Sequence, residues 1–235
     1  AFRMLPEVVW NMPRLGTFNL HASLLPQYRG AAPINWAVIN GDTETGVTTF
    51  FLKQEIDTGM IIRQKRLPIA DTDNVGTVHD KLMAMGASLV TETVDLILEG
   101  KVETLPQNRL YKDEKELRPA PKIFKETCRI NWMRSLKSIY DFIRGLSPYP
   151  AAWTELVPND NSSKRQVVKI YQTEKHMASH SFAIGSIHTD NKNYIDIAVN
   201  GGFLRILSLQ LAGKKRMSAH DFLNGFKQLS LFHVE

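Results

Sequence analysis

The sequence predicts an α/β domain followed by a linker and a small OB-type β-barrel, and three observations carry this prediction. In the first hundred residues, strand-like segments alternate with helical ones, which is typical of α/β layers. Residues 103–122 then turn charged and proline-rich. Beyond residue 150, five short strand-like segments crowd into about 60 residues. We therefore predict a domain at 1–102, a linker at 103–122 and a domain at 123–235, with a β-sandwich open as the alternative to the barrel.

The first predicted domain contains two kinds of periodic segment. Alternating or β-branched runs predict strands at 17–21, 47–52 and 61–69, and short apolar runs predict helices at 7–11 and 34–39. The clearest helix should open at Thr77, with Asp80 completing a capping-box-like pair, and stop at Gly100.

The second half opens with an amphipathic helix at 136–143, which Gly145 and Pro148 should end. The predicted strands follow at 153–157, 167–171, 182–188, 194–199 and 203–211. A tight turn is expected at 200–202, where the sequence reads NGG. Ser218 and Asp221 should open a last helix that buries Phe222, Leu223 and Phe226.

The charge of +5 is concentrated in the second half of the chain. Residues 1–122 hold 14 Lys and Arg against 15 Asp and Glu, whereas residues 123–235 hold 15 against 9. Such an asymmetry favours a polyanionic partner for the basic half, although a solvated surface explains it equally well.

Several classes of protein are disfavoured by composition. No run approaches the ~18 apolar residues of a membrane span, so we expect no membrane partner. A single cysteine, Cys128, excludes an internal disulfide and a cysteine-rich metal site, and fits a reducing compartment. The chain begins with AFRMLP, which reads as the end of a strand and shows no signal peptide.

Three polar side chains are candidates for chemistry. Asn19 and His21 lie two apart on one predicted strand and therefore share a face, and Asp57 follows the next strand region. In open α/β sheets ligands bind beyond the carboxyl ends of strands, where these groups could polarise a carbonyl and move a proton. Spacing alone is weak evidence, because a lone histidine on a strand is usually structural. No third metal ligand lies nearby, and no Gly-x-Ser-x-Gly elbow surrounds Ser23.

Residues 18–33, FNLHASLLPQYRGAAP, resemble the central signature of the folate-dependent formyltransferases. The segments Gly46-Val47-Thr48 and Asp57-Thr58-Gly59 are similar to flanking segments of that family. The resemblance implies that residues 1–102 are the C-terminal part of a Rossmann-like formyltransferase domain. The family opens with a nucleotide-binding-type half absent here, some 80–90 residues at ~30 per βα unit, so we expect an incomplete representation of a longer protein.

The same resemblance implies a reaction in which an amine attacks a formyl carbon. Asn19 and a protonated His21 would stabilise the oxyanion, and Asp57 would orient His21 and relay the amine's proton. The co-substrate would be 10-formyltetrahydrofolate, with no metal. The implied cofactor-binding residues are Phe2, Arg3, Met4, Leu5, Ser23, Leu24, Leu25, Pro26, Glu55, Ile56 and Gly59.

The second half indicates the acceptor. Residues 208–223 are similar to the closing segment of the methionyl-tRNA formyltransferases, and residues 129–132 and 148–153 resemble that family's entry into its C-terminal domain. We therefore expect methionyl-initiator tRNA as partner of a monomer in the bacterial cytoplasm, with an organelle still open. The RNA-binding candidates are Arg29, Lys214, Lys215 and Arg216. The alternatives are a nucleotide-sugar amine formyltransferase and a non-catalytic RNA-binding remnant, and the basic triplet could be only a solvated turn.

Overall fold

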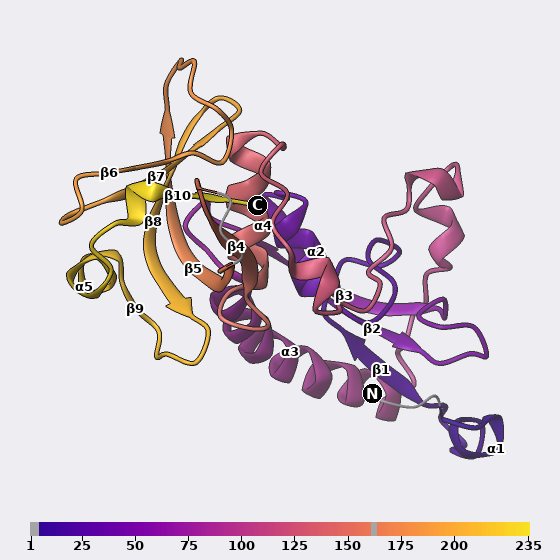
Figure 1. The fold of residues 1–235 in the computed structure, drawn as a ribbon. Coiled ribbons are helices and arrows are strands. Elements are labelled where there is room, and N and C mark those ends of the chain that lie inside the picture. The colour runs from indigo at the N-terminus through magenta and orange to yellow at the C-terminus, as the bar shows by residue number, and fades with distance from the viewer. Residues whose placement is uncertain (1–4, 161–163) are drawn as a thin grey trace. The chain divides into compact units, whose positions relative to one another are not determined.

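The computed structural model describes residues 5–160 and 164–235, and it divides the chain into two compact units. Unit 1 comprises Ala1–Ala37, Asp42–Asp73 and Thr77–Lys122, and unit 2 comprises Val38–Gly41, Asn74–Gly76 and Ile123–Glu235. Figure 1 shows a long helix beside a small sheet in unit 1 and a curved set of strands in unit 2.

Unit 1 is built on the three-stranded sheet β1-β2-β3, formed by Phe18–His21, Glu44–Phe51 and Ile61–Pro68. The β-branched and aromatic residues of β2 explain its central place, because the strand is buried from Thr45 to Phe50. Both strand pairs are antiparallel, with His21 opposite Thr48 and Phe18 opposite Phe51. The Rossmann-like domain that the resemblance implies stays a prediction, because these three strands show only antiparallel pairing.

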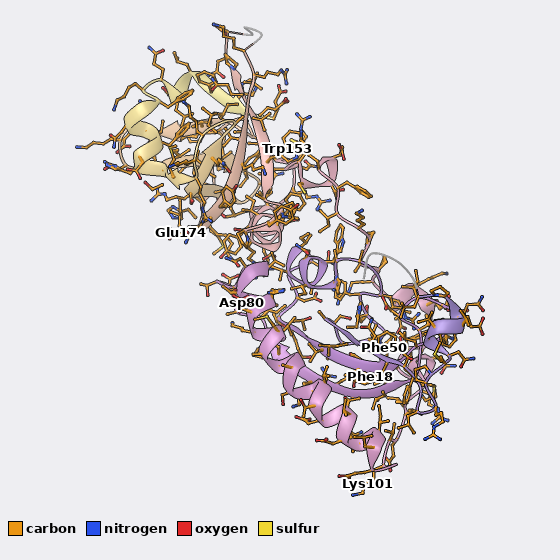
Figure 2. All side chains as sticks on the ribbon, turned by 90° about the horizontal axis from the view of Figure 1, so that it is seen from below. Phe18, Phe50, Asp80, Lys101, Trp153 and Glu174 are labelled. Carbon is orange, nitrogen blue, oxygen red and sulfur yellow. The ribbon has the colours of Figure 1, made fainter. Side chains whose placement is uncertain are left out.

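Helix α3, Val75–Leu98, packs along this sheet. A Cβ on Gly86 would lie 2.6 Å from a methyl of Leu20, so the helix approaches β1 where it has no side chain. Thr93 on the helix hydrogen-bonds Thr49 on β2, with 2.9 Å between the hydroxyls. Figure 2 shows the helix running between Asp80 and Lys101, beside the strands that carry Phe18 and Phe50.

The predicted start of this helix is wrong. Thr77 lies inside α3, and its hydroxyl donates to Asp73 Oδ1 at 3.0 Å. Asp73 also accepts from the Ala70 N–H and from Lys81, so one carboxylate in front of the helix collects three donors. This hydrogen bonding lowers the pKa of Asp73 against the opposing effect of burial. The helix ends as expected before Gly100, which has φ +66.

The remaining elements of unit 1 are short. They are α1, Glu7–Trp10; α2, Pro33–Ile39, whose last two residues belong to unit 2; and the 3₁₀ turns η1, Gln107–Arg109, and η2, Glu114–Glu116. The segment 103–122, predicted as a linker, is hydrogen-bonded to unit 1 near both ends. Leu105 exchanges backbone bonds of 2.8 and 2.9 Å with Ile61, and Ala120 donates to the Arg29 carbonyl at 2.8 Å. The domain boundaries stay predictions.

Unit 2 is a nearly closed antiparallel barrel with the strand order β10-β4-β5-β8-β7-β6. An isolated bridge between Ser186 and His233 brings the two edges together, and β9 pairs with β8. Its strands are β4, Ala152–Pro158; β5, Gln166–Met177; β6, Ile187–Thr189; β7, Ile195–Val199; β8, Gly202–Leu211; β9, Met217–Ser218; and β10, Phe232–Val234. This arrangement is consistent with an OB-like fold.

The sequence placed most of these strands correctly and misjudged three features. The predicted strand at 182–188 is wrong, since β6 begins only at Ile187 and Phe182 is half-exposed. The β5 strand extends to Met177, beyond the predicted end at residue 171. Helix α4, Leu136–Leu146, passes through Gly145 because Gly145 is buried inside it, so the expected stop there is wrong.

The last helix follows its prediction closely. Helix α5, Ala219–Gly225, begins after Ser218, whose hydroxyl accepts from the Asp221 N–H. Phe222 and Leu223 are buried, whereas Phe226 is half-buried and stacks on Phe222 with ring centroids 5.1 Å apart. Two further 3₁₀ turns complete the unit: η3, Glu126–Cys128, and η4, Leu229–Leu231. Among the residues that the structure describes, no helix is long and apolar enough to cross a membrane.

Candidate active site

His21 ends strand β1 and is nearly buried, with 6% of its surface exposed. Its Nε2 lies 2.8 Å from the carbonyl oxygen of Tyr28. Because a carbonyl can only accept, Nε2 must carry a proton, and Nδ1 is left to face Asp57 Oδ2 at 3.7 Å. A second proton on Nδ1 would therefore meet a carboxylate, which is the arrangement needed to hold a charged imidazolium.

Asp57 reaches His21 from the loop between β2 and β3. The sequence placed it beyond the end of a strand next to β1, but β2 runs antiparallel to β1 and ends beside Phe18, at the far end of β1 from His21. The loop must therefore turn back, and Asp57 does so with φ +53 in the left-handed region. Its Oδ2 accepts from the Gly30 N–H at 3.0 Å, which fixes the carboxylate near His21.

Gly59 closes the same loop through a close approach. The left-handed residue of this loop is Asp57 and not Gly59. A Cβ on Gly59 would lie 1.6 Å from the Phe51 carbonyl oxygen, a distance at which no side chain fits. The Phe51 N–H donates to the Met60 carbonyl at 2.9 Å, so a backbone hydrogen bond joins the two ends of the loop.

Asn19 lies two residues before His21 and is exposed on β1. The structure thus joins His21 to Asp57 by direct approach and leaves Asn19 on the surface of the same strand. An exposed amide can donate to an arriving carbonyl oxygen.

Two polar side chains hold the backbone of the segment after β1, at Ser23 and Leu25. The Thr48 hydroxyl donates to the Ser23 carbonyl at 2.7 Å and accepts from the Leu25 N–H at 3.2 Å. Gln64 on β3 donates to the Leu25 carbonyl at 2.8 Å. Leu25 also packs with Phe50 and Ile61 in a buried cluster. These contacts fix the backbone of residues 23–25, which leads to the Tyr28 carbonyl that accepts from His21.

The residues proposed to bind a folate fall into three groups. Phe2, Arg3 and Met4 lie outside the described residues. Four others are buried and can support a folate pocket without exposing much surface to the ligand: Ser23, Leu25, Pro26 and Gly59. The Ser23 hydroxyl is already used, since it donates to the Gln27 carbonyl. The members with exposed surface are Leu5, Leu24, Glu55 and Ile56, the apolar Ile56 being 59% exposed directly beside Asp57.

Glu55 is ionised on the rim of this loop. A hydrogen bond from Lys53, with N and O 3.2 Å apart, and the charge of Lys53 lower the pKa of Glu55; the Thr58 hydroxyl adds a weaker contact at 3.3 Å. The rim therefore combines an apolar side chain with a fixed negative charge.

The basic triplet lies on the turn between β8 and β9 in unit 2. Lys214 and Lys215 are exposed, whereas Arg216 is held in place. Its guanidinium carbon lies 4.5 Å from the Tyr171 ring centroid, and its Nε donates to the Ser208 hydroxyl at 2.8 Å. Arg29, the fourth RNA-binding candidate, belongs to unit 1 and donates two hydrogen bonds to Gln107.

Sequence reasoning missed the supporting residues Gln107, Gln64 and Arg118. Arg118 donates to Asp42, and Asp42 also accepts from the Tyr28 hydroxyl. The Arg118 guanidinium carbon lies 4.9 Å from the Tyr28 ring centroid. Each acts on a residue far away in the chain, and each sits in a segment without distinctive periodicity. No local signal in the sequence could have identified them.

Unit 2 contains a surface hollow of about 720 Å³ that is separate from these residues. Met177, His180, Phe182 and Asn200 are among the side chains that line it. His180 Nε2 donates to the carbonyls of Val199 and Gly202, both at 2.9 Å. Within residues 5–160 and 164–235, no group of three or more His, Cys, Asp or Glu could hold a metal ion.

Comparisons with known proteins place the chain in a family. The family model described as formyl transferase matches residues 2–94, and that described as formyl transferase, C-terminal domain, matches residues 122–227. A methionyl-tRNA formyltransferase of Parabacteroides distasonis is 74% identical over 234 residues, which cover 100% of this chain and 72% of that protein. One from Phocaeicola vulgatus is 71% identical over 227 residues, which cover 97% and 69%.

Two solved structures share the fold. HypX from Aquifex aeolicus in complex with tetrahydrofolic acid matches with a TM-score of 0.65 and 17% identity, over 97% of this chain and 38% of that one. WlaRD, a sugar 3N-formyl transferase, matches with a TM-score of 0.59 and 23% identity, over 84% and 66%. At these identities the likeness concerns the fold alone.

Proposed function

The chain belongs to the methionyl-tRNA formyltransferase family, and from this membership we infer that it moves a formyl group from 10-formyltetrahydrofolate to the amino group of methionyl-initiator tRNA. The observation that carries this inference is the 74% identity to a methionyl-tRNA formyltransferase across the whole chain. The pair formed by His21 and Asp57 supplies the matching chemistry.

The proposed reaction is a direct transfer between two amines. The methionyl nitrogen attacks the formyl carbon, the carbonyl oxygen becomes negative, and the bond from that carbon to N10 of the folate then breaks. Asn19, exposed on β1, donates to the oxyanion, and His21 adds its charge when doubly protonated. A well-placed donor of this kind contributes about 2.7–4 kcal/mol to catalysis.

In this proposal Asp57 takes part in moving the proton from the attacking amine to N10 of the folate. The attacking amine must lose one proton and N10 of the folate must gain one, so the site needs a group that accepts and returns it. Asp57 Oδ2 lies 3.7 Å from His21 Nδ1, which is longer than a hydrogen bond, and the carboxylate and imidazole would exchange the proton once bound substrates bring them closer. Of the proposed folate contacts, Ile56 and Glu55 are exposed beside Asp57, where Ile56 can pack on the ring face of a pterin and Glu55 can accept from N–H groups at its edge.

Unit 2 would bind the tRNA backbone. Lys214, Lys215 and Arg216 stand on one turn of an OB-like barrel, and Tyr171 holds the Arg216 cation in one orientation. Arg29 is the proposed contact of unit 1, where Gln107 orients its guanidinium. A monomer in the bacterial cytoplasm is part of the proposal, and the bacterial relatives support that place.

The test is formyl transfer from 10-formyltetrahydrofolate to methionyl-tRNA by the full-length protein and its His21→Ala variant. The expected result is transfer by the wild type and a loss in kcat of about 100- to 1000-fold in the variant. His79→Ala is a matched control, because His79 is exposed on α3. An unchanged rate in His21→Ala would refute the catalytic assignment.

A second acceptor separates the competing functions. An amino-sugar nucleotide, offered alone and in competition with methionyl-tRNA, should give no product. Preferential formylation of the sugar would overturn the tRNA assignment and keep the chemistry. Binding of methionyl-tRNA without binding of folate would identify an RNA-binding remnant instead.

A further inference from the structure

Gln107 is a buried polar residue in the segment 103–122, and the reaction described above gives it no role. It opens the 3₁₀ turn η1, and only 4% of its surface is exposed. Two residues before it, Leu105 exchanges two backbone hydrogen bonds with Ile61 at the start of β3. The amide therefore enters the interior of unit 1 from a backbone that is held to the sheet.

The side chain of Gln107 uses both of its polar atoms on loops of the candidate site. Its Nε2 donates to the carbonyls of Asp57 and Gly59, at 2.9 and 2.8 Å. Its Oε1 accepts from Arg29 Nε and Nη2, at 3.0 and 2.7 Å. The reverse orientation of the amide would point its two hydrogens at a guanidinium and its oxygen at two carbonyls, so the partners determine the orientation.

These contacts close a ring around the Asp57 carboxylate. Gln107 holds the backbone of Asp57 on one side and the Arg29 side chain on the other. Arg29 precedes Gly30, whose N–H donates to Asp57 Oδ2 at 3.0 Å. The ring thus runs from Asp57 through Gly30, Arg29 and Gln107 back to Asp57, and it spans two loops and the segment 103–122.

Asp57 needs such support because its own conformation does not favour its position. Its φ of +53 lies in the left-handed region, which a non-glycine residue keeps only when its surroundings impose it. The two carbonyls that Gln107 binds are that of Asp57 itself and that of Gly59, two residues further along the same turn. The Asp57 carboxylate lies 3.7 Å from His21, so a small shift of the loop would separate the pair.

We propose that Gln107 is a positioning residue that holds Asp57 in reach of His21 and so sets the rate of the proton transfer. This role rests on the proposed formyl transfer. It assigns a part in that reaction to a residue that lies between the two stretches matched by the family models, 2–94 and 122–227. Gln107 acts on the reaction through Asp57, so loss of its contacts to that loop should lower kcat and leave the KM for the folate unchanged. Loss of its contact to Arg29 should act on the KM for methionyl-tRNA instead.

Two substitutions separate the two arms of the amide. Gln107→Glu keeps an oxygen acceptor for Arg29 and loses the donors to Asp57 and Gly59. Gln107→Met keeps the approximate size of the side chain and loses both arms. Asn108→Ala is the matched control, because Asn108 is exposed in the same turn. Each full-length variant is assayed for formylation of methionyl-tRNA, with kcat and both KM values determined well below its thermal midpoint.

Both Gln107 variants should lose about 10- to 100-fold in kcat, since a displacement near 1 Å of a reacting group costs up to ~100-fold. Both variants should keep a KM for the folate within about two-fold of the wild type. Gln107→Glu should also keep its KM for methionyl-tRNA, whereas Gln107→Met, which releases Arg29, should raise it. Asn108→Ala should match the wild type. If Gln107→Met does not fold, Gln107→Glu still decides, because it retains the Arg29 contact. Wild-type kcat in Gln107→Glu would overturn the role, and so would a raised KM with unchanged kcat. An inactive wild type would overturn the proposed function itself, and this role with it.

Discussion

The candidate reaction centre of unit 1 and the basic turn of unit 2 hold their polar side chains in opposite ways. His21 and Asp57 expose only 7% and 13% of their side chains, and main-chain groups from distant segments hold them. Lys214 and Lys215 stand exposed on a turn, and only Arg216 of that triplet is oriented by a neighbour. Proton transfer needs atoms placed within a fraction of an ångström, whereas attraction to a phosphate backbone needs charge near the right place.

The difference teaches where each unit is sensitive to mutation. In unit 1, small changes in loop geometry should act on the rate of the chemical step. In unit 2, changes of charge should act on the affinity for tRNA, and changes of the core should act on stability. The following predictions test this division, beginning with the largest expected effect.

Gly59→Ala should have the largest effect on catalysis among the following changes. The new Cβ would lie 1.6 Å from the Phe51 carbonyl oxygen, so the loop that carries Asp57 must move. We expect kcat to fall by at least ~100-fold. The control is Gly225→Ala, at the end of α5, where an added Cβ meets no atom within 4 Å. Steady-state formylation of methionyl-tRNA measures both, and equal rates for the two variants would contradict the rigid-loop description.

Leu204→Ala should weaken the barrel without changing the chemistry. Leu204 on β8 is fully buried, and removing such a side chain costs about 2–5 kcal/mol of unfolding free energy. Leu25→Ala, at a buried position of unit 1, should cost a similar amount. Only Leu25→Ala should also lower kcat, because Leu25 belongs to the segment that presents Tyr28 to His21.

Urea unfolding measures the stability of both leucine variants, and formylation at low temperature measures kcat. A normal kcat in Leu25→Ala would show that the loop tolerates a cavity beneath it. A lowered kcat in Leu204→Ala would show that the barrel core also controls the chemical step.

Replacing Lys214, Lys215 and Arg216 together by alanine should raise the KM for methionyl-tRNA about ten-fold or more at moderate salt, with little change in kcat. The slope of log affinity against log salt should decrease by about 2 units, at ~0.7–0.9 per lost phosphate contact. The matched control replaces three exposed lysines of unit 1: Lys101, Lys112 and Lys115. Equal effects of the two triple variants would mean that net charge alone matters.

The smallest expected effect concerns Cys128. Burial raises the pKa of its thiol, with the charge of Lys169 opposing, and its Sγ donates to the Phe124 carbonyl at 3.2 Å. Because the thiolate is the reactive form, the folded protein should resist a thiol reagent even at pH 9, where an exposed cysteine reacts readily. Rapid labelling without unfolding would contradict the burial of Cys128.

The sequence predicted the strands of both units well because alternation and β-branched runs are local signals. The helix ends were less well predicted, since they depend on distant or buried groups. The start of α3 follows the Asp73 carboxylate, and α4 passes through Gly145 because packing outweighs the low helix propensity of glycine. The strand expected at 182–188 forms only from Ile187, because the chain turns just before it at Gly185, which has φ +84.

By itself the sequence determined the order of the elements and the family, since these depend on neighbouring residues and a recognisable motif. It also named three candidate residues for the chemistry, whose roles stay a prediction. Only the tertiary structure decided how Asp57 meets His21. The antiparallel course of β2 carries the chain away from His21, and a left-handed turn, Gly30 and Gln107 bring Asp57 back. Gln107 lies 50 residues from Asp57 and 78 from Arg29, and a contact at such separation leaves no trace in a local pattern. Its hydrogen bonds form only once the chain has folded and water has left, which is why a segment that reads as a linker can support the reaction centre.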